Sequence, residues 1–350
     1  MITLDGAKIL VDERIAQELS QLGTRARTVG PQFQEMVGII DEVSHHGGKR
    51  IRPYMSMLMY EAYSGRDGSE ILTAAVSQEF LHFAMLVHDD VTDQDTVRHG
   101  EKNVTGRYLD LYEDVLASPA RRRREADNMA ILAGDLLQAR AYRLMTYIEA
   151  KPDVKRAIED LMADTVERVI GGQVLDIQAT FQGEDIDPLV IAEHKTASYT
   201  FEMPLIAGAM LADASEEQLA LLREVGLKVG IGYQLMDDLL GVFGDEATTG
   251  KSAQGDLREG KRTTLINAFD RLANEKQKQK FYALFGQSLT SKEFTQARNL
   301  LVASGARKAI EKDLGRIIRS TTRLVEKLAI DSEYKIALGQ LVSKGLNRQK

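Results

Sequence analysis

The stretch from Leu81 to Asp93 reads LHFAMLVHDDVTD and joins an apolar segment to three aspartates, Asp89, Asp90 and Asp93. The apolar residues recur with a helical period, so the pattern predicts a helix that carries the aspartates. Asp89 and Asp93 are four residues apart and would share one helical face, where two like charges repel by about 3 kcal/mol at an effective dielectric of about 20. A cation between them would reverse the sign of that interaction.

A second acidic pair, Asp237-Asp238, follows another apolar segment in the sequence IGYQLMDDLLG at residues 231–241. Acidic runs usually form a solvated helix face, but such a face would not be preceded by apolar residues in both places. We therefore interpret the two clusters as halves of one metal site. Carboxylate oxygens without cysteine or paired histidines favour Mg²⁺ over Zn²⁺.

Composition sets the broad class of the protein. The chain has 350 residues, of which 43% are hydrophobic and 28% charged, so it can bury a large core as a globular protein. The absence of cysteine excludes a disulfide framework and a thiolate zinc site, and it suits a cytoplasmic location. The charged N-terminus and the lack of an 18-residue apolar run predict neither export nor a transmembrane segment. A net charge of −7 opposes nucleic-acid binding.

Helical periodicity and only six prolines predict an all-α fold in a single domain over residues 1–350. Capping patterns at Asp187-Pro188, Ser215 and Thr290 mark three helix starts. The expected helices span residues 5–23, 31–44, 50–64, 69–93, 124–150, 154–181, 188–212, 216–242, 262–285, 291–303 and 306–329, with one more at the C-terminus. The segments 94–123, with Arg121–Arg124 in a solvated loop, and 244–260 are expected to be long loops beside the site.

Basic residues accompany the acidic clusters, and several of them follow glycine. They occur in Gly47–Pro53, at Arg98-His99, at Lys195-Thr196, and at Lys251 and Lys261. Backbone N–H groups and ammonium groups in such loops can bind phosphate, although Gly-Lys pairs are also common in ordinary turns. His82 precedes Asp89 by two helical turns, so it is either a core histidine or part of the same site.

These motifs together resemble those of the trans-isoprenyl diphosphate synthases, the polyprenyl synthetase family. The matching segments are His88–Asp93 with Arg98–Gly100, Gln234–Gly241, Gly47–Pro53, Gly134-Asp135, Gly172-Gln173, Lys195-Thr196 and Gly250–Leu265. They occur in the family's order and cover about residues 45 to 266. The resemblance implies an isoprenoid-synthase-type helical bundle around a central cavity, a homodimer, and Mg²⁺ at about three ions per site.

The resemblance also implies a reaction in which isopentenyl diphosphate condenses with an allylic diphosphate of C5 to C15 to give a trans-polyprenyl diphosphate. Fixed cations would stabilise the pyrophosphate leaving group, and water must be excluded from the allylic cation. Asp89, Asp93 and Asp237 would be metal ligands and catalytic, with Asp90 and Asp238 in support. The implied ligands of the allylic diphosphate are Arg98, Lys195, which is also catalytic, Lys251 and Lys261. The implied ligands of isopentenyl diphosphate are Lys49, Arg52 and His82. Thr196, Gln173 and Gln234 would orient the bound groups near the reacting carbons.

Two positions depart from the family pattern. Gly241 stands where many members have a third aspartate, and Asp256 is a candidate to compensate for it. His99 stands where an arginine that binds isopentenyl diphosphate is usual, and a neutral imidazole would hold a diphosphate more weakly than a guanidinium.

Product length depends, by the same resemblance, on the residues before Asp89. Large aromatic residues four or five positions earlier would stop the chain early, but these positions are Met85 and Ala84, with Phe83 and Leu81 as deeper candidates. The pattern therefore favours geranylgeranyl diphosphate (C20). Alternatives are a longer polyprenyl product, a non-catalytic partner subunit of a heteromeric synthase, a terpene cyclase, or a structural helical protein.

Overall fold

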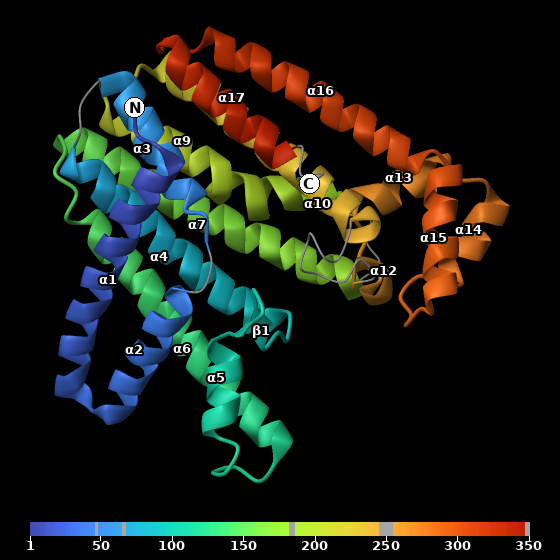
Figure 1. Cartoon of the computed structure of the whole chain (residues 1–350), viewed down its shortest axis with the longest axis horizontal. Helices are drawn as coiled ribbons and strands as arrows, with labels where there is room; N and C mark the ends of the chain where they lie inside the picture. The colour runs from blue at the N-terminus through green and yellow to red at the C-terminus, as the bar shows by residue number, and fades with distance from the viewer. Residues whose placement is uncertain (46–47, 65–67, 182–185, 245–254, 347–350) are drawn as a thin grey trace. The chain divides into compact units, whose positions relative to one another are not determined.

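The computed structural model describes residues 1–45, 48–64, 68–181, 186–244 and 255–346. In that part of the chain, helices dominate and one two-stranded hairpin is present (Figure 1). The all-α prediction is confirmed. The chain divides into two compact units, the first with residues 1–159 and 207–213, the second with residues 160–206 and 214–350. The expectation of a single domain stays a prediction.

The first unit carries the first aspartate cluster. Its elements are α1 (Leu4–Val29), α2 (Pro31–Ser44), α3 (Ile51–Ser64), α4 (Ser69–Thr92), β1 (Val97–Arg98), β2 (Glu101–Lys102), α5 (Val104–Leu111), α6 (Pro119–Met145), the start of α7 (Pro152–Phe181) and the end of α9 (Met203–Leu211).

Helix α4 packs along α6 in the core of this unit. The Ser77 hydroxyl donates to the carbonyl oxygen of Ala141 at 2.8 Å, and a Cβ on Gly134 would lie 2.2 Å from Nε2 of His88. Small residues on α6 therefore let it approach α4 closely, which fixes the helix that ends in the aspartates. Within the described residues, Glu70–Thr92 is long and apolar enough to cross a bilayer, but 67% of its apolar window is buried, as expected of a core helix.

The second unit carries the second aspartate cluster. It contains the rest of α7, α8 (Pro188–Ile191), the π-helix η1 (Ala192–Glu202), the start of α9, α10 (Glu216–Phe243), α12 (Gly255–Glu259), α13 (Thr264–Leu272), α14 (Glu275–Tyr282), α15 (Ser291–Ala303), α16 (Ala306–Lys327) and α17 (Ser332–Leu346).

Aromatic packing and glycine contacts organise this second unit. The rings of Phe269 and Phe281 lie 4.5 Å apart in a buried cluster that includes Leu239 and Leu265 of α10 and α13. A Cβ on Gly230 of α10 would lie 2.1 Å from that of Ala197 in η1. Helix α10 is therefore held against η1 on one side and against the aromatic cluster further along.

The capping predictions are confirmed. The Asp187 side chain accepts from the backbone N–H of Leu189 at 3.0 Å, and Ser215 accepts from that of Gln218. Thr290 and Glu293 form a reciprocal capping box.

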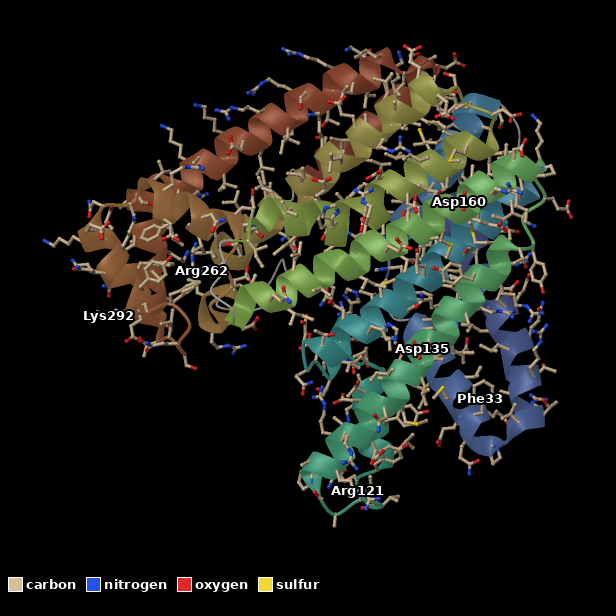
Figure 2. The ribbon with its side chains drawn as sticks, turned by 180° about the vertical axis from the view of Figure 1, so that it is seen from behind. Phe33, Arg121, Asp135, Asp160, Arg262 and Lys292 are labelled. Atoms are coloured by element: carbon tan, nitrogen blue, oxygen red, sulfur yellow. The ribbon has the colours of Figure 1, made fainter. Side chains whose placement is uncertain are left out.

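Four sequence predictions differ from the structure. The loop expected over 244–260 ends in helix α12, and residues 245–254 of it lie outside the described residues. Segment 94–123 is not a long loop, because it contains the hairpin, α5 and the first turn of α6. The arginines at 121–124 consequently lie in α6, which begins at Pro119 with Ser118 as its N-cap; Figure 2 shows Arg121 near this start and Asp135 further along the helix. The helix expected over 262–285 is two helices, since a capping box at Asn274 starts α14. The helix expected over 188–212 is π-helical in its middle.

Candidate active site

The first aspartate cluster lies at the C-terminal end of α4, where the helix macrodipole disfavours negative charge. The backbone N–H of Asp93 donates to the carbonyl oxygen of Asp89 at 2.8 Å, so the two residues are one helical turn apart, as the sequence predicts. Asp89 is half-buried and Asp93 is exposed. Oxygen donors at a negative helix end fit a hard cation such as Mg²⁺.

Asp90 faces a different partner. Its side chain is 4% exposed and its Oδ1 accepts from Nε and Nη2 of Arg98 at 2.8 and 2.5 Å, while Nη2 also lies 3.7 Å from Oδ2 of Asp89. Burial raises the pKa of Asp90, although the hydrogen bonds from Arg98 oppose this effect. The pair ties the hairpin to the end of α4, which fits the supporting role predicted for Asp90.

His82 lies two turns before Asp89 and is surrounded by cationic groups. Desolvation and the charges of Arg52, Arg98, Arg50 and His99 hold the pKa of His82 well below its usual value. The imidazole is therefore neutral at pH 7, and the cationic groups near it form a place where an anion would be stabilised. The structure thus brings together four of the residues predicted to bind diphosphate, Arg52, His82, Arg98 and His99.

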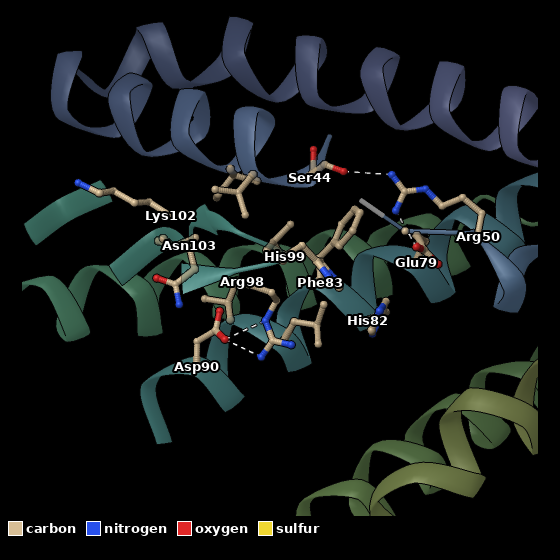
Figure 3. A pocket seen from close by; sticks show the side chains of 17 residues that line it. Ser44, Arg50, Glu79, His82, Phe83, Asp90, Arg98, His99, Lys102 and Asn103 are labelled. Atoms are coloured by element: carbon tan, nitrogen blue, oxygen red, sulfur yellow. Dashed lines mark hydrogen bonds and ion pairs between the residues drawn. The ribbon is translucent and has the colours of Figure 1, made fainter. Parts of the chain in front are cut away.

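A pocket in the first unit is lined by His82 and by three of the cationic residues around it, Arg50, Arg98 and His99 (Figure 3). Its volume is about 710 Å³ when the space open to solvent is included, and it is lined by α2, Gly48 and Arg50, α4, the hairpin, the start of α5 and Leu137 of α6. Phe83, Leu86 and Val87 form an apolar wall, while the Asp90–Arg98 pair and the Arg50–Glu79 pair lie at separate places on its border.

His99 occupies the turn of the hairpin. Its φ is 55° and that of Gly100 is 83°, the left-handed conformations that a two-residue hairpin turn requires. Histidine adopts this conformation more readily than most residues. His99 is exposed and lines the pocket, so the substitution of histidine for arginine lies beside the predicted isopentenyl diphosphate ligands.

The second aspartate cluster, near the end of α10, has one exposed and one buried member. Asp237 is exposed, whereas Asp238 is 3% exposed and accepts hydrogen bonds from Gln234 at 2.9 Å and from the backbone N–H and hydroxyl of Thr264. Burial raises the pKa of Asp238 to about 6 despite these bonds. Asp238 therefore anchors α13 to α10, and Asp237 is the carboxylate directed to solvent.

Gly241 leaves room for a carboxylate from another helix. A Cβ at this position would lie 2.2 Å from Oδ2 of Asp256 in α12. The side chain of Asp256 thus lies where the missing third aspartate of the motif would begin, and its compensation for that aspartate stays a prediction.

Lys195 belongs to the π-helix η1, and its Nζ donates to Oδ2 of Asp176 in α7 at 2.6 Å. A Cβ on Gly172 of α7 would lie 2.5 Å from the backbone nitrogen of Lys195. The Gly172-Gln173 and Lys195-Thr196 motifs are therefore in contact, and π-helical segments are frequent at functional sites. Gln173 and Thr196 are half-buried.

Lys261 follows α12, and its backbone N–H donates to the carbonyl oxygen of Asp256 at 3.0 Å. Its Nζ lies 3.9 Å from Oε2 of Glu259, and its side chain is 43% exposed. Lys251 lies outside the described residues.

The two aspartate clusters belong to different compact units. Among the described side chains, no group of three or more His, Asp or Glu residues is close enough to hold a metal ion by itself. The combination of both clusters in one metal site stays a prediction.

The four product-length candidates differ in their surroundings. Leu81 and Ala84 are buried, while Phe83 and Met85 are partly accessible. The Phe83 ring lies 5.1 Å from the Arg50 guanidinium in the pocket wall. Phe83 and Met85 are about 200° apart around α4, so they cannot border the same side of the helix.

Sequence reasoning did not assign a role to Arg50 or Glu79. Arg50 is 4% exposed and donates to Oε1 of Glu79 at 2.8 Å. Its place between Lys49 and Arg52 is the sequence signal that could have marked Arg50 as part of the site. The burial of its side chain, however, depends on carboxylate acceptors from α1 and α4.

Comparison with known proteins gives one consistent family. Residues 33–301 match the family model described as polyprenyl synthetase. A geranylgeranyl diphosphate synthase from Sulfolobus acidocaldarius is 31% identical over 72% of this chain and 73% of its own length. A geranylfarnesyl diphosphate synthase from Aeropyrum pernix is 28% identical over 87% of this chain and 91% of its own.

The fold is also similar to a solved structure. The crystal structure of a geranylgeranyl pyrophosphate synthase from Corynebacterium glutamicum, complexed with isoprenyl diphosphate and magnesium, has a TM-score of 0.91 and 28% identity, covering 99% of this chain and 100% of its own. The aspartates at the end of α4, the cationic group around His82 and these matches agree, and the chain belongs to the polyprenyl synthetase family of trans-prenyltransferases.

Proposed function

We propose that this protein is a Mg²⁺-dependent enzyme that condenses isopentenyl diphosphate with an allylic diphosphate of C5 to C15 and releases geranylgeranyl diphosphate. The observation that carries the proposal is the arrangement in the first unit. Asp89 and Asp93 lie one turn apart at the end of α4. His82 lies two turns earlier on α4, and Arg52, Arg98 and His99 from other segments lie around it.

Asp89, Asp93 and Asp237 would hold Mg²⁺, which would neutralise the charge of the departing pyrophosphate. Arg98 would hold the allylic diphosphate from its position between Asp89 and Asp90. Lys49 and Arg52 would bind the diphosphate of isopentenyl diphosphate, and neutral His82 would add a hydrogen bond. These fixed charges require no reorganisation when the allylic carbon–oxygen bond breaks.

The C20 product is supported by the residues that precede Asp89. Ala84 is small and buried, and Met85 is not aromatic, so neither blocks an extending chain as an aromatic ring would. One turn of helix advances by about 5.4 Å, roughly one isoprene unit. The similarity to a geranylfarnesyl diphosphate synthase keeps a longer product as the second candidate.

The test is incubation of the purified protein with Mg²⁺, radiolabelled isopentenyl diphosphate and, separately, C5, C10 and C15 allylic diphosphates. The dephosphorylated products are then separated by chromatography. A Mg²⁺-dependent C20 alcohol is expected. A ladder of longer alcohols would favour the longer product, and no extension from any starter would favour a non-catalytic partner subunit.

Substitution of the aspartates tests their assignment. We expect Asp89→Ala and Asp237→Ala to abolish condensation while the helical circular dichroism spectrum stays unchanged. Asp313→Ala is a matched control, because Asp313 is an accessible aspartate on α16. Full activity in either site variant would remove the metal assignment.

We also propose that the enzyme is a homodimer. Helix α6 exposes adjacent apolar residues, with Ile131 at 43% and Leu132 at 54% exposure, and such residues are common at protein interfaces. Sedimentation equilibrium should give twice the chain mass, and Leu132→Asp should shift the equilibrium to monomer. A monomeric wild-type protein would refute this assembly.

A further inference from the structure

Arg50 is a buried cation that connects three helices of the first unit. Its Nε donates to Oδ1 of Asp12 in α1 at 2.7 Å, its Nη1 to Oε1 of Glu79 in α4 at 2.8 Å, and its Nη2 to the carbonyl oxygen of Ser44 at the end of α2 at 3.0 Å (Figure 3 shows the last two). Its guanidinium also lies over the ring of Phe83. Two carboxylates compensate one buried charge, so this arginine is committed to the protein and does not serve as a diphosphate ligand.

The backbone beside Arg50 depends on this anchored side chain. Arg50 has a φ of 49°, a left-handed conformation that is strained for a non-glycine residue, and the φ of Gly48 is 88°. A Cβ on Gly48 would lie 2.7 Å from Nη1 of Arg50, so the guanidinium folds back over Gly48. The contacts of the guanidinium therefore hold the chain in a conformation that it would not adopt by itself.

This conformation determines where the neighbouring basic residues lie. Arg50 is buried whereas Lys49 is exposed, so the two consecutive side chains point in opposite directions. The carbonyl oxygen of Arg50 accepts from the backbone N–H of Tyr54 at 3.1 Å, so Arg50 also starts α3, whose first turn carries Arg52. Arg52 in turn lies close enough to His82 to lower its pKa.

We propose that Arg50 is a positioning residue for isopentenyl diphosphate: its buried contacts with Asp12, Ser44 and Glu79 fix the backbone that presents Lys49 and Arg52 to the diphosphate. The inference rests on the proposed function and adds a residue that acts through its neighbours. A loss of the anchor should weaken the binding of isopentenyl diphosphate without affecting the allylic substrate to the same extent.

The first variant is Arg50→Lys, which keeps the positive charge but cannot reach all three acceptors at once. We expect the KM for isopentenyl diphosphate to rise about tenfold, the KM for the allylic diphosphate to change by less than about twofold, and kcat to stay within about threefold. Asp12→Asn is a milder second variant, because the contacts with Glu79 and Ser44 remain, and it should shift the same KM in the same direction.

The matched control is Arg140→Lys. Arg140 is 5% exposed and forms a buried pair with Glu18, so its loss perturbs a similar ion pair of the same unit. It should lower the unfolding temperature comparably to Arg50→Lys while both KM values stay within about twofold of wild type. An equal rise in the isopentenyl diphosphate KM in this control would overturn the inference, because general destabilisation would then explain the effect.

A double-mutant cycle with Lys49→Ala gives the sharpest test. If Arg50 acts through Lys49, Arg50→Lys should raise the KM much less in the Lys49→Ala background than in wild type. Independent, multiplying effects would refute the role through Lys49, as would an unchanged KM in Arg50→Lys. The two hypotheses fail in different ways. If the wild-type enzyme extends no allylic starter, the proposed function is wrong. If the wild-type enzyme is active but its Arg50 variants keep the wild-type KM, only the role of Arg50 is wrong.

Discussion

Gly172→Ala should displace the π-helix that carries Lys195. An alanine methyl at this position would lie 2.5 Å from the backbone nitrogen of Lys195 and 2.9 Å from its Cα. Ordinary contact begins near 3.4 Å, so α7 and η1 must separate locally by about 0.9 Å. Because the atoms in the way are backbone, the clash cannot be relieved by a rotation of a side chain.

The size of the effect follows from two terms. Overpacking costs about 1–3 kcal/mol, whereas alanine in place of glycine in a helix gains about 1 kcal/mol. The adjacent Gly171 is exposed and has nothing within 4 Å of an added Cβ, so Gly171→Ala receives only the gain. Both glycines lie within α7 and share this gain, so the two variants should differ by the overpacking cost alone, about 1–3 kcal/mol in the free energy of unfolding.

Urea unfolding and steady-state kinetics of both variants provide the assay. A displacement of about 1 Å at a substrate-binding group can cost about a hundredfold in rate, so kcat/KM of Gly172→Ala should fall by about that factor while Gly171→Ala stays near wild type. If the two variants unfold within about 0.5 kcal/mol of each other and turn over equally, the contact between Gly172 and Lys195 does not govern the site.

Three further predictions concern single positions. His99→Arg should lower the KM for isopentenyl diphosphate in steady-state kinetics, because a guanidinium is always charged and can bind a diphosphate with two parallel hydrogen bonds, and an unchanged or higher KM would place residue 99 away from that substrate. The pKa of His82 is lowered, so below about pH 6.5 the unfolded chain takes up a proton that the folded chain refuses, and stability should fall as the pH decreases from about 7 to 5. His82→Gln should lose this part of the slope in pH-dependent urea unfolding, and an identical slope would contradict the assignment. Gly241→Ala should displace the Asp256 carboxylate, whose Oδ2 would lie 2.2 Å from the added methyl, and lower kcat/KM, while stability stays within about 1 kcal/mol of the control Gly339→Ala because that carboxylate can rotate away; equal activity of the two variants would argue against a role for Asp256.

Much of the helical framework could be predicted because it depends on local sequence. The period of apolar residues before Asp89 predicts α4, and the capping boxes predict the starts of other helices. The one-turn spacing of Asp89 and Asp93 is likewise a local property, since residues four apart in a helix share a face whatever the surroundings. The Ser118-Pro119 signal for α6 was also present in the sequence, but the charged arginines that follow it suggested a loop.

Other features depend on residues far apart in the chain. The helical pattern of residues 192–202 does not distinguish an α-helix from a π-helix, and here glycines of α7 and α10 pack closely against that segment. Asp256 fills the space at Gly241 only because α12 returns to α10.

The sequence by itself thus determined most of the helices, the two aspartate clusters and the family, since all three follow from short-range spacing and residue type. Tertiary structure alone decided which charged residues face inward and which remain available to a substrate. Arg50 and Lys49 are adjacent and chemically similar, yet one is buried between Asp12 and Glu79 and the other is exposed. A basic side chain is buried only where carboxylates from other helices compensate its charge, and no local pattern contains that information.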